Sequence, residues 1–167
     1  VDEAGSDSPT DRVEDVEGGV WERTMAVDLN GQFYCARRAV PLLRNAGGGS
    51  IICIASTAAF FGFPLRSPYA ACKWAIIGFA KTLAMELGPE RIRVNAICPG
   101  SVSGPRIDGV IERDAESRGM QPEEIRELYL RQTSMRTFVE AEDVAEMAFF
   151  LASPAGARIS GQAIGVD

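Results

Sequence analysis

The chain has 167 residues and a net charge of −6 at pH 7, and 46% of its residues are hydrophobic and 24% charged. A chain of this length and composition can form one globular domain with a buried core. The acidic charge and the absence of basic runs argue against a nucleic-acid partner, and no stretch has the roughly 18 uncharged apolar residues of a membrane span.

Cysteine and histidine usage argues against a metal site. Histidine is absent, and the four cysteines form no C-x-x-C pair, so zinc is not predicted. Each cysteine lies in an apolar run, where we expect a small core residue in a reducing cytoplasm: Cys35, Cys53, Cys72 and Cys98. The first residues, V-D-E-A-G-S-D-S, show no secretion signal, so a cytoplasmic protein is expected.

The first half of the chain predicts a long helix followed by a buried strand. After an acidic, turn-rich segment at residues 1–19, apolar residues recur every three or four positions over 20–43, which is typical of a helix. The glycines at 47–49 precede the next apolar run, so we interpret them as a turn and not as a phosphate-binding loop. The run at 51–54 predicts a buried strand that leads to Ser56.

The second half alternates helices and strands. Helices are predicted at residues 68–87 and 140–152, a strand at 93–98, and a last strand in I-S-G-Q-A-I-G-V-D. Residues 103–138 are polar and helix-prone. This order is that of an α/β fold, in which ligands bind beside the carboxyl ends of the strands.

Three polar side chains are expected at one such crevice. Ser56 follows one strand, and Tyr69 and Lys73 are four residues apart at the start of the next helix, on one helix face. A free tyrosine is a poor base at neutral pH, but a nearby ammonium favours the phenolate and so suits the pair to proton transfer. Ser56 can hydrogen-bond a substrate oxygen on which charge develops. The chemistry indicated is reduction of a carbonyl or its reverse, with the hydride carried by a cofactor.

The spacing of this trio resembles the active-site motif of the short-chain dehydrogenase/reductase family. That family has a serine, a tyrosine thirteen residues later and a lysine four residues further on, which here are Ser56, Tyr69 and Lys73. The resemblance implies that Tyr69 is the catalytic acid/base and that Ser56 positions the carbonyl. It also implies that Lys73 binds the nicotinamide ribose and promotes ionisation of Tyr69.

A second motif of the family follows the strand at 93–98. Pro99-Gly100-Ser101-Val102-Ser103 resembles the family's P-G-x-V-x-T turn. The resemblance implies an NAD or NADP cofactor whose nicotinamide is lined by Pro99, Gly100, Val102 and Ser103. Alone, a Y-x-x-x-K pair is usually a helix-surface pair, a serine after a strand is usually a cap, and Pro-Gly is a turn. Their occurrence together at the family's spacings favours the catalytic interpretation.

Two segments depart from the family's pattern. V-D-L-N-G at residues 27–31 resembles V-N-L-x-G, but Asp28 stands at the position of the family's catalytic asparagine. The resemblance implies that this asparagine helps to hold a proton-relay water near the lysine. An aspartate can accept the same hydrogen bond and adds a negative charge. V-D-E-A-G at residues 1–5 resembles V-N-N-A-G, with Asp2 and Glu3 in place of the two asparagines.

The resemblance also implies a substrate lid and a subunit interface. Residues 103–138 correspond to the family's lid over a small-molecule carbonyl or alcohol substrate. Helix 68–87 has more apolar positions than one sheet face needs, and in the family this helix packs against its copy in a neighbouring subunit. A homo-oligomer, dimer or tetramer, is therefore implied; the alternative is a helix buried within its own domain.

The fold implied is a single, partial Rossmann-like domain over residues 1–167, with three layers around a parallel sheet. The family's strands 5 to 7 are readable, whereas strands 1 to 4 are absent, as is the T-G-x-x-x-G-x-G turn that receives the pyrophosphate. We therefore expect the 167 residues alone to bind NAD(P) poorly. The alternatives to an NAD(P)-dependent oxidoreductase are a cofactor-free lyase or isomerase acting through Tyr69, and a non-catalytic assembly subunit.

Overall fold

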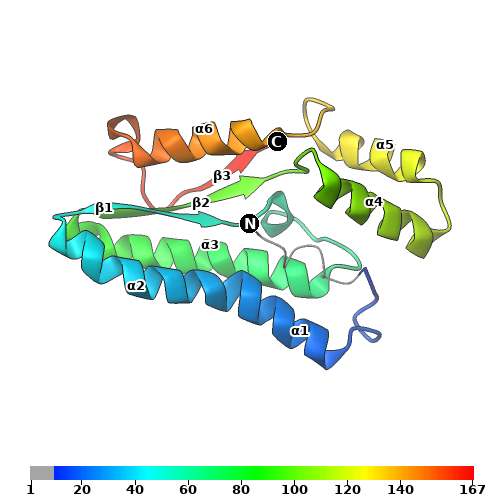
Figure 1. Cartoon of the computed structure of the whole chain (residues 1–167), viewed down its shortest axis with the longest axis horizontal. Helices are drawn as coiled ribbons and strands as arrows, with labels where there is room; N and C mark the ends of the chain where they lie inside the picture. Colours follow the sequence, from blue (N-terminus) through cyan, green and yellow to red (C-terminus); the bar gives the residue numbers. More distant parts are fainter. Residues whose placement is uncertain (1–9) are drawn as a thin grey trace.

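Three parallel strands form the sheet at the centre of the fold. The computed structural model describes residues 10–167. β1 (Gly49–Ile54) and β3 (Ala163–Val166) pair with the two edges of β2 (Ile92–Pro99), so the strand order is β1-β2-β3 (Figure 1). Because both pairings are parallel, the carboxyl ends of all three strands lie at one edge of the sheet.

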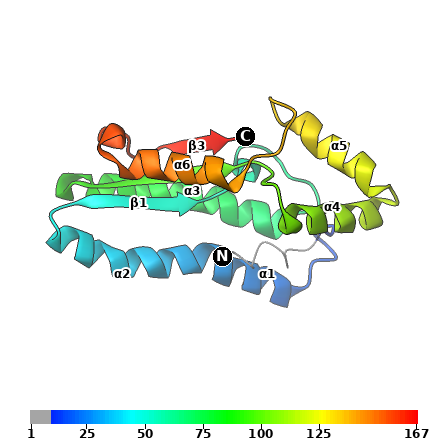
Figure 2. The same cartoon turned by 45° about the horizontal axis from the view of Figure 1, so that its top comes forward.

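Helices cover both faces of this sheet. α2 (Gly31–Asn45) and α3 (Ser67–Leu87) lie on one face, and α6 (Ala141–Ala152) lies on the other (Figure 2). α1 (Gly18–Thr24) continues into α2 through a π-helical segment, Met25–Asn30. Short 3-10 turns occupy Thr57–Ala59, Gly88–Glu90 and Pro154–Gly156. The three-layer α/β arrangement expected from the sequence is confirmed.

The central strand is buried because it is paired on both edges and covered on both faces. Ile92, Val94, Ala96 and Cys98, which alternate along β2, share one apolar cluster with residues of α3 such as Ile76. Burying an isoleucine of this kind contributes about 1.5–3 kcal/mol to stability. On the other face, the buried Asn95 amide donates to the carbonyl of Ile159 at 2.9 Å, and its oxygen accepts from the backbone of Gln162 at 3.1 Å. Asn95 thereby fixes the loop that leads into β3.

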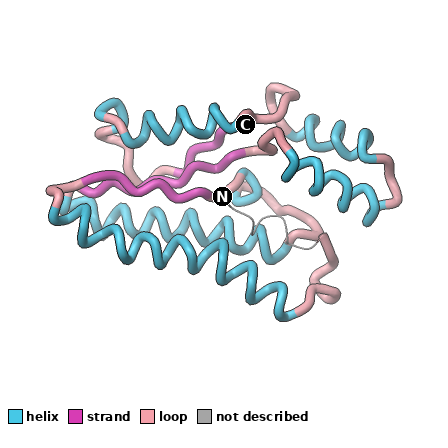
Figure 3. The backbone as a smooth tube through the Cα atoms, viewed as in Figure 1, coloured by secondary structure: helices cyan, strands magenta, loops and turns pink. Residues whose placement is uncertain are grey.

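A helical hairpin extends beyond the carboxyl edge of the sheet. α4 (Pro105–Arg118) and α5 (Pro122–Gln132) occupy the segment predicted as a lid (Figure 1). The loops after β1 and β2 both leave the sheet at this edge (Figure 3). The hairpin has an apolar cluster of its own, separate from that of the sheet: Ile107, Val110, Ile111, Ala115 and Ile125.

The predicted elements are found with boundary differences of one to four residues. The predicted helix at 20–43 is interrupted by the π-helical segment, and the predicted strand at 51–54 begins two residues earlier. The expectation of four core cysteines is wrong for Cys35, which is exposed although the adjacent Ala36 on α2 is buried, because consecutive helical residues point about 100° apart. Asp2 and Glu3 lie outside the described residues. Among residues 10–167, no helix is long and apolar enough to cross a membrane.

The glycine-rich segment before β1 is a turn, as predicted, and Gly48 is the position that requires glycine. Its φ is +133°, and a Cβ there would lie 2.6 Å from the carbonyl oxygen of Arg91. An L side chain at this position meets both backbone strain and a clash with rigid main chain.

We expect Gly48→Ala to lower the free energy of unfolding by about 1–3 kcal/mol, measured by urea denaturation. Gly78→Ala is the control, because Gly78 lies inside α3 with open space around its Cα, where alanine stabilises a helix by about 0.5–1 kcal/mol. Equal stability of the two variants would contradict the proposed steric requirement.

Candidate active site

The structure brings the predicted site residues into one hollow at the carboxyl edge of the sheet. Ser56, Tyr69 and Lys73 line a cavity of about 860 Å³ together with the turn Pro99–Ser103. The inner faces of α4 and α6 close its far side through Ile107 and Val144. This position, outside the ends of parallel strands, is where open α/β sheets bind ligands.

Ser56 is held in place by the turn that follows β1. Its backbone is extended, and its Oγ accepts a hydrogen bond from the backbone N–H of Ala58 at 3.2 Å, which caps the 3-10 turn Thr57–Ala59. A serine hydroxyl can donate one hydrogen bond and accept two. The Ser56 oxygen accepts the capping hydrogen bond, and its hydrogen can still be donated to another group. The donor is available to a ligand in the cavity.

Tyr69 and Lys73 occupy the first two turns of α3. Pro68 at the start of the helix is tolerated because its missing N–H has no intrahelical partner there. The ammonium of Lys73 lies 5.3 Å from the centre of the Tyr69 ring, as expected for side chains four residues apart on one helix face. Both residues are buried, with exposures of 8% for Tyr69 and 2% for Lys73.

Asp28 pairs with Lys73 across the helix interface. Its Oδ1 lies 3.3 Å from Nζ of Lys73, and both side chains are almost completely buried. Asp28 is part of the π-helical segment, a distortion that is frequent at functional sites. Asp28, which stands at the position of the family's asparagine, therefore accepts a hydrogen bond from the ammonium of Lys73.

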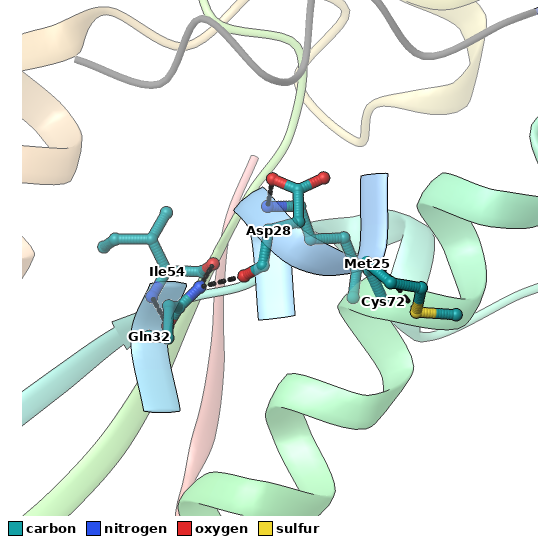
Figure 4. Close-up of polar contacts among 6 residues, drawn as sticks. Met25, Asp28, Gln32, Ile54 and Cys72 are labelled. Atoms are coloured by element: carbon teal, nitrogen blue, oxygen red, sulfur yellow. Dashed lines mark hydrogen bonds and ion pairs between the residues drawn. The ribbon is translucent and has the colours of Figure 1, made fainter. Parts of the chain in front are cut away.

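Two contacts fix the π-helical segment that carries Asp28. Gln32 donates to the carbonyl of Ile54 at 2.9 Å and accepts from its N–H at 3.2 Å, so that its amide binds the end of β1 as a peptide group would. Figure 4 shows Gln32 between Ile54 and the Asp28 carbonyl. On the other side, the sulfur of Met25 lies 3.3 Å from that of Cys72, the residue before Lys73.

The turn after β2 is fixed by backbone contacts to two other segments. The N–H of Gly100 donates to the carbonyl of Val166 at 2.9 Å, and a Cβ on Gly100 would lie 2.7 Å from that of Asp167, so glycine permits this close approach. Val102 pairs with Val139 as an isolated parallel bridge. The Ser103 hydroxyl and the Glu140 carboxylate are 2.9 Å apart, which ties the turn to the start of α6.

Arg66 is a further charged residue of this cavity that the sequence analysis did not identify. It is the residue before α3 and is only 4% exposed, and its guanidinium carbon lies 5.2 Å from the centre of the Tyr69 ring. Arg66 directly precedes the helix that carries Tyr69 and Lys73. Its position three residues before Tyr69 was the signal in the sequence that could have identified it.

Cysteine chemistry and a metal centre are not supported at this site. Burial raises the pKa of Cys98, beside the cavity, to about 11, so its thiol is not ionised at neutral pH. The pKa values of Cys53 and Cys72 are also raised to about 11, mainly by burial. In the part of the chain that the structure describes, no three Cys, Asp or Glu side chains are grouped to hold a metal ion.

Comparisons with known proteins define the class of this chain as an α/β protein related to dehydrogenases and reductases. A family model described as enoyl-(acyl carrier protein) reductase matches residues 1–167. D-beta-hydroxybutyrate dehydrogenase of Rhizobium meliloti (strain 1021) is 35% identical over 158 residues, which is 94% of this chain and 61% of the relative. The 3-oxoacyl-[acyl-carrier-protein] reductase FabG of Thermotoga maritima is 34% identical, over 88% of this chain and 55% of the relative. The chain belongs to the short-chain dehydrogenase/reductase family.

Solved structures agree with this assignment. An actinorhodin polyketide ketoreductase variant with NADPH is 29% identical and has a TM-score of 0.88, over 94% of this chain and 61% of that one. Levodione reductase, at 22% identity, shares the fold with a TM-score of 0.89, over 96% of this chain and 61% of that one. The chain thus spans about three fifths of the length of these proteins.

The Asp28–Lys73 pair gives a stability prediction. Asp28→Leu removes a carboxylate that binds a buried ammonium and should cost about 3–5 kcal/mol, whereas Asp28→Asn keeps an oxygen acceptor and should cost less. The measurement is urea denaturation. Asp108→Leu, which removes the half-exposed partner of Arg126, is the control and should cost about 1 kcal/mol or less. Equal losses in Asp28→Asn and Asp28→Leu would show that the hydrogen bond contributes nothing.

Proposed function

We propose that this chain forms the catalytic part of an NAD(P)-dependent oxidoreductase that interconverts a carbonyl and a secondary alcohol. The observation that carries the proposal is that Ser56, Tyr69 and Lys73 share one cavity with the turn Pro99–Ser103. Relatives named as dehydrogenases and reductases support it. Because the chain spans only part of their length, the activity is a proposal for the protein that contains it.

The residues of the cavity fit the nicotinamide end of the cofactor. Pro99, Gly100, Val102 and Ser103 present a wall of small side chains and backbone, and Tyr69 and Lys73 face the same space with donors suited to ribose hydroxyls. When bound, the nicotinamide supplies or accepts the hydride. The similar actinorhodin polyketide ketoreductase variant holds NADPH, which supports this cofactor class.

In the reducing direction, each side chain has a separate role in protonating the carbonyl oxygen. The hydroxyl of Ser56 donates a hydrogen bond to that oxygen, where negative charge develops. The phenol of Tyr69 donates the proton, and the ammonium of Lys73 stabilises the resulting phenolate. The carboxylate of Asp28 accepts a hydrogen bond from this ammonium and so holds it near the ring. In the oxidising direction the phenolate removes the alcohol proton.

The wider organisation follows the same proposal. Residues 1–167 act as one partial Rossmann-like domain whose segment 103–138 closes over the substrate. Exposed apolar side chains on α2 and α3, including Leu42 at 70% and Met85 at 82%, support a homo-oligomer. The cysteines form no disulfide in the described residues, which is compatible with a reducing cytoplasm.

In the full-length protein that contains this chain, we expect Tyr69→Phe to lower kcat at least about 100-fold, because the phenol is the group that moves the proton. The measurement is NADH or NADPH consumption with a panel of ketones and aldehydes, with circular dichroism to verify the fold. Tyr34→Phe, at an exposed position on α2, is the control and should leave kcat unchanged. Unchanged turnover in Tyr69→Phe would remove this residue from the mechanism.

Lys73→Arg is also expected to lose most activity and to weaken cofactor binding. Arginine keeps the charge, but its planar fork cannot replace a compact ammonium enclosed by Tyr69 and Asp28. The test measures kcat and the KM for NADH in both lysine variants. Lys81→Arg, at the chain's other lysine, is the matched control, because Lys81 is exposed and donates only to the Gly161 carbonyl. Near-normal kinetics in Lys73→Arg would mean that charge alone suffices.

A further inference from the structure

Arg66 is a buried cation for which residues 10–167 supply no compensating anion. Its side chain is 4% exposed, its Nε has no hydrogen-bond partner, and within residues 10–167 no carboxylate lies within ion-pair distance of it. Burial lowers its pKa, but a guanidinium stays protonated in proteins. An uncompensated buried charge is costly, which is why such groups are normally paired.

A buried carboxylate that lines the same hollow as Arg66 has a partner of its own. Asp114 on α4 is 2% exposed, and its Oδ1 accepts from Nε of Arg118 at 2.6 Å. It also interacts with Tyr129, whose pKa is raised mainly by burial and then by this carboxylate. Asp114 therefore interacts with Arg118 and Tyr129, whereas Arg66 has two tyrosines as neighbours, Tyr129 and Tyr69.

The position of Arg66 makes it accessible to a ligand in spite of its burial. It lines the catalytic cavity and also a neighbouring hollow of about 460 Å³, and the two share the wall formed by Phe61, Phe63, Tyr129 and Gln132. In the smaller hollow, Thr10 presents a second buried polar atom, Oγ1, that has no partner.

The surrounding charges favour an anion at this position. Arg106 lines the catalytic cavity, and both Arg106 and Arg113 are close enough to Arg66 to lower its pKa further by like-charge repulsion. A bound anion relieves this repulsion and fills the unused guanidinium donors, and such charge-assisted bonds are the strong ones.

We infer that Arg66 binds an anionic group of the substrate, a carboxylate or a phosphate, positioned a few bonds from the carbonyl that Tyr69 protonates. The short distance follows from the 5.2 Å between the guanidinium carbon and the Tyr69 ring centre. The inference rests on the proposed function for the position of the reacting carbon. It adds the substrate class, an oxo acid or oxo phosphate in place of a neutral ketone.

The test compares charged and neutral probes that differ only at the anionic group. The carboxylate pairs are 3-oxobutanoate and 4-oxopentanoate with their methyl esters, and the phosphate pair is dihydroxyacetone phosphate with dihydroxyacetone. We expect the protein containing this chain to prefer the charged member of at least one pair by about 10-fold or more in kcat/KM. The pair that shows the preference identifies carboxylate or phosphate.

The variant Arg66→Met should remove this preference, so that the ratio of kcat/KM for the charged and neutral members of a pair falls to about one. A merely structural role would lower both values equally, and Arg66→Lys, which keeps the charge without the fork, should retain part of the preference. Arg131→Met is the matched control, because Arg131 is exposed on α5 and lines neither hollow. Should Arg66→Met not fold, the charged and neutral probes still test the inference on the unaltered protein.

Calorimetric binding of the charged probes separates this inference from the proposed activity. Reduction of neutral probes without preference for, or binding of, charged ones would overturn the role of Arg66 and leave the oxidoreductase intact. Binding that is lost in Arg66→Met but never leads to turnover would support the anion site and count against the hydride transfer. Absence of both binding and turnover would overturn both.

Discussion

The burial of β2 is the constraint on which the site depends. Both edges of β2 are paired and both of its faces are covered, so the chain leaves this strand at the carboxyl edge of the sheet. Parallel pairing brings the end of β1 to the same edge, so Ser56 and the Pro99 turn become neighbours although they are distant in sequence. α3 runs back along the sheet from this edge. Its first turns, which carry Tyr69 and Lys73, therefore also lie at the carboxyl edge.

The electrostatics of the site are organised around the Tyr69 ring. Lys73 and Arg66 approach it at 5.3 and 5.2 Å, and the two cations differ in their surroundings. The ammonium of Lys73 is paired with the carboxylate of Asp28. Asp28 lies in the π-helical segment, and Gln32 binds the end of β1 next to that segment. A buried pair of this kind is weak evidence for stability, since desolvation offsets much of the attraction. Its contribution here is to fix the position of the ammonium relative to the phenol.

The elements of the fold were predictable from hydrophobic periodicity, and the trio from its spacing. Residues 51–54 form an uninterrupted apolar run and residues 93–98 a mainly apolar one, and such runs are typical of parallel strands with helices on both faces of the sheet. The π-helical segment was not predictable, because apolar residues spaced by three or four positions are equally compatible with an uninterrupted α-helix. The exposure of Cys35 was missed for a related reason, since an apolar run does not reveal which side of the helix meets the sheet.

Arg66 was missed because arginine is common in this chain and because its burial depends on the lid, whose helices are distant in sequence. The sequence contains fifteen arginines, and composition does not distinguish the one that lies under a tyrosine ring. The roles assigned to Ser56, Tyr69 and Lys73 stay predictions: their convergence on one cavity is a geometric fact, whereas proton transfer is a property of the working enzyme.

The separate apolar cluster of the α4–α5 hairpin has a consequence for how the protein can diversify. Ile111 and Ile125 stabilise the hairpin without contributing to the cluster around β2. Free-energy changes at sites without shared neighbours are nearly additive. Substitutions on the cavity side of the hairpin can therefore alter what is accepted as a ligand while the sheet keeps its stability. Fold maintenance and ligand choice are assigned to different residues, so one can change without loss of the other.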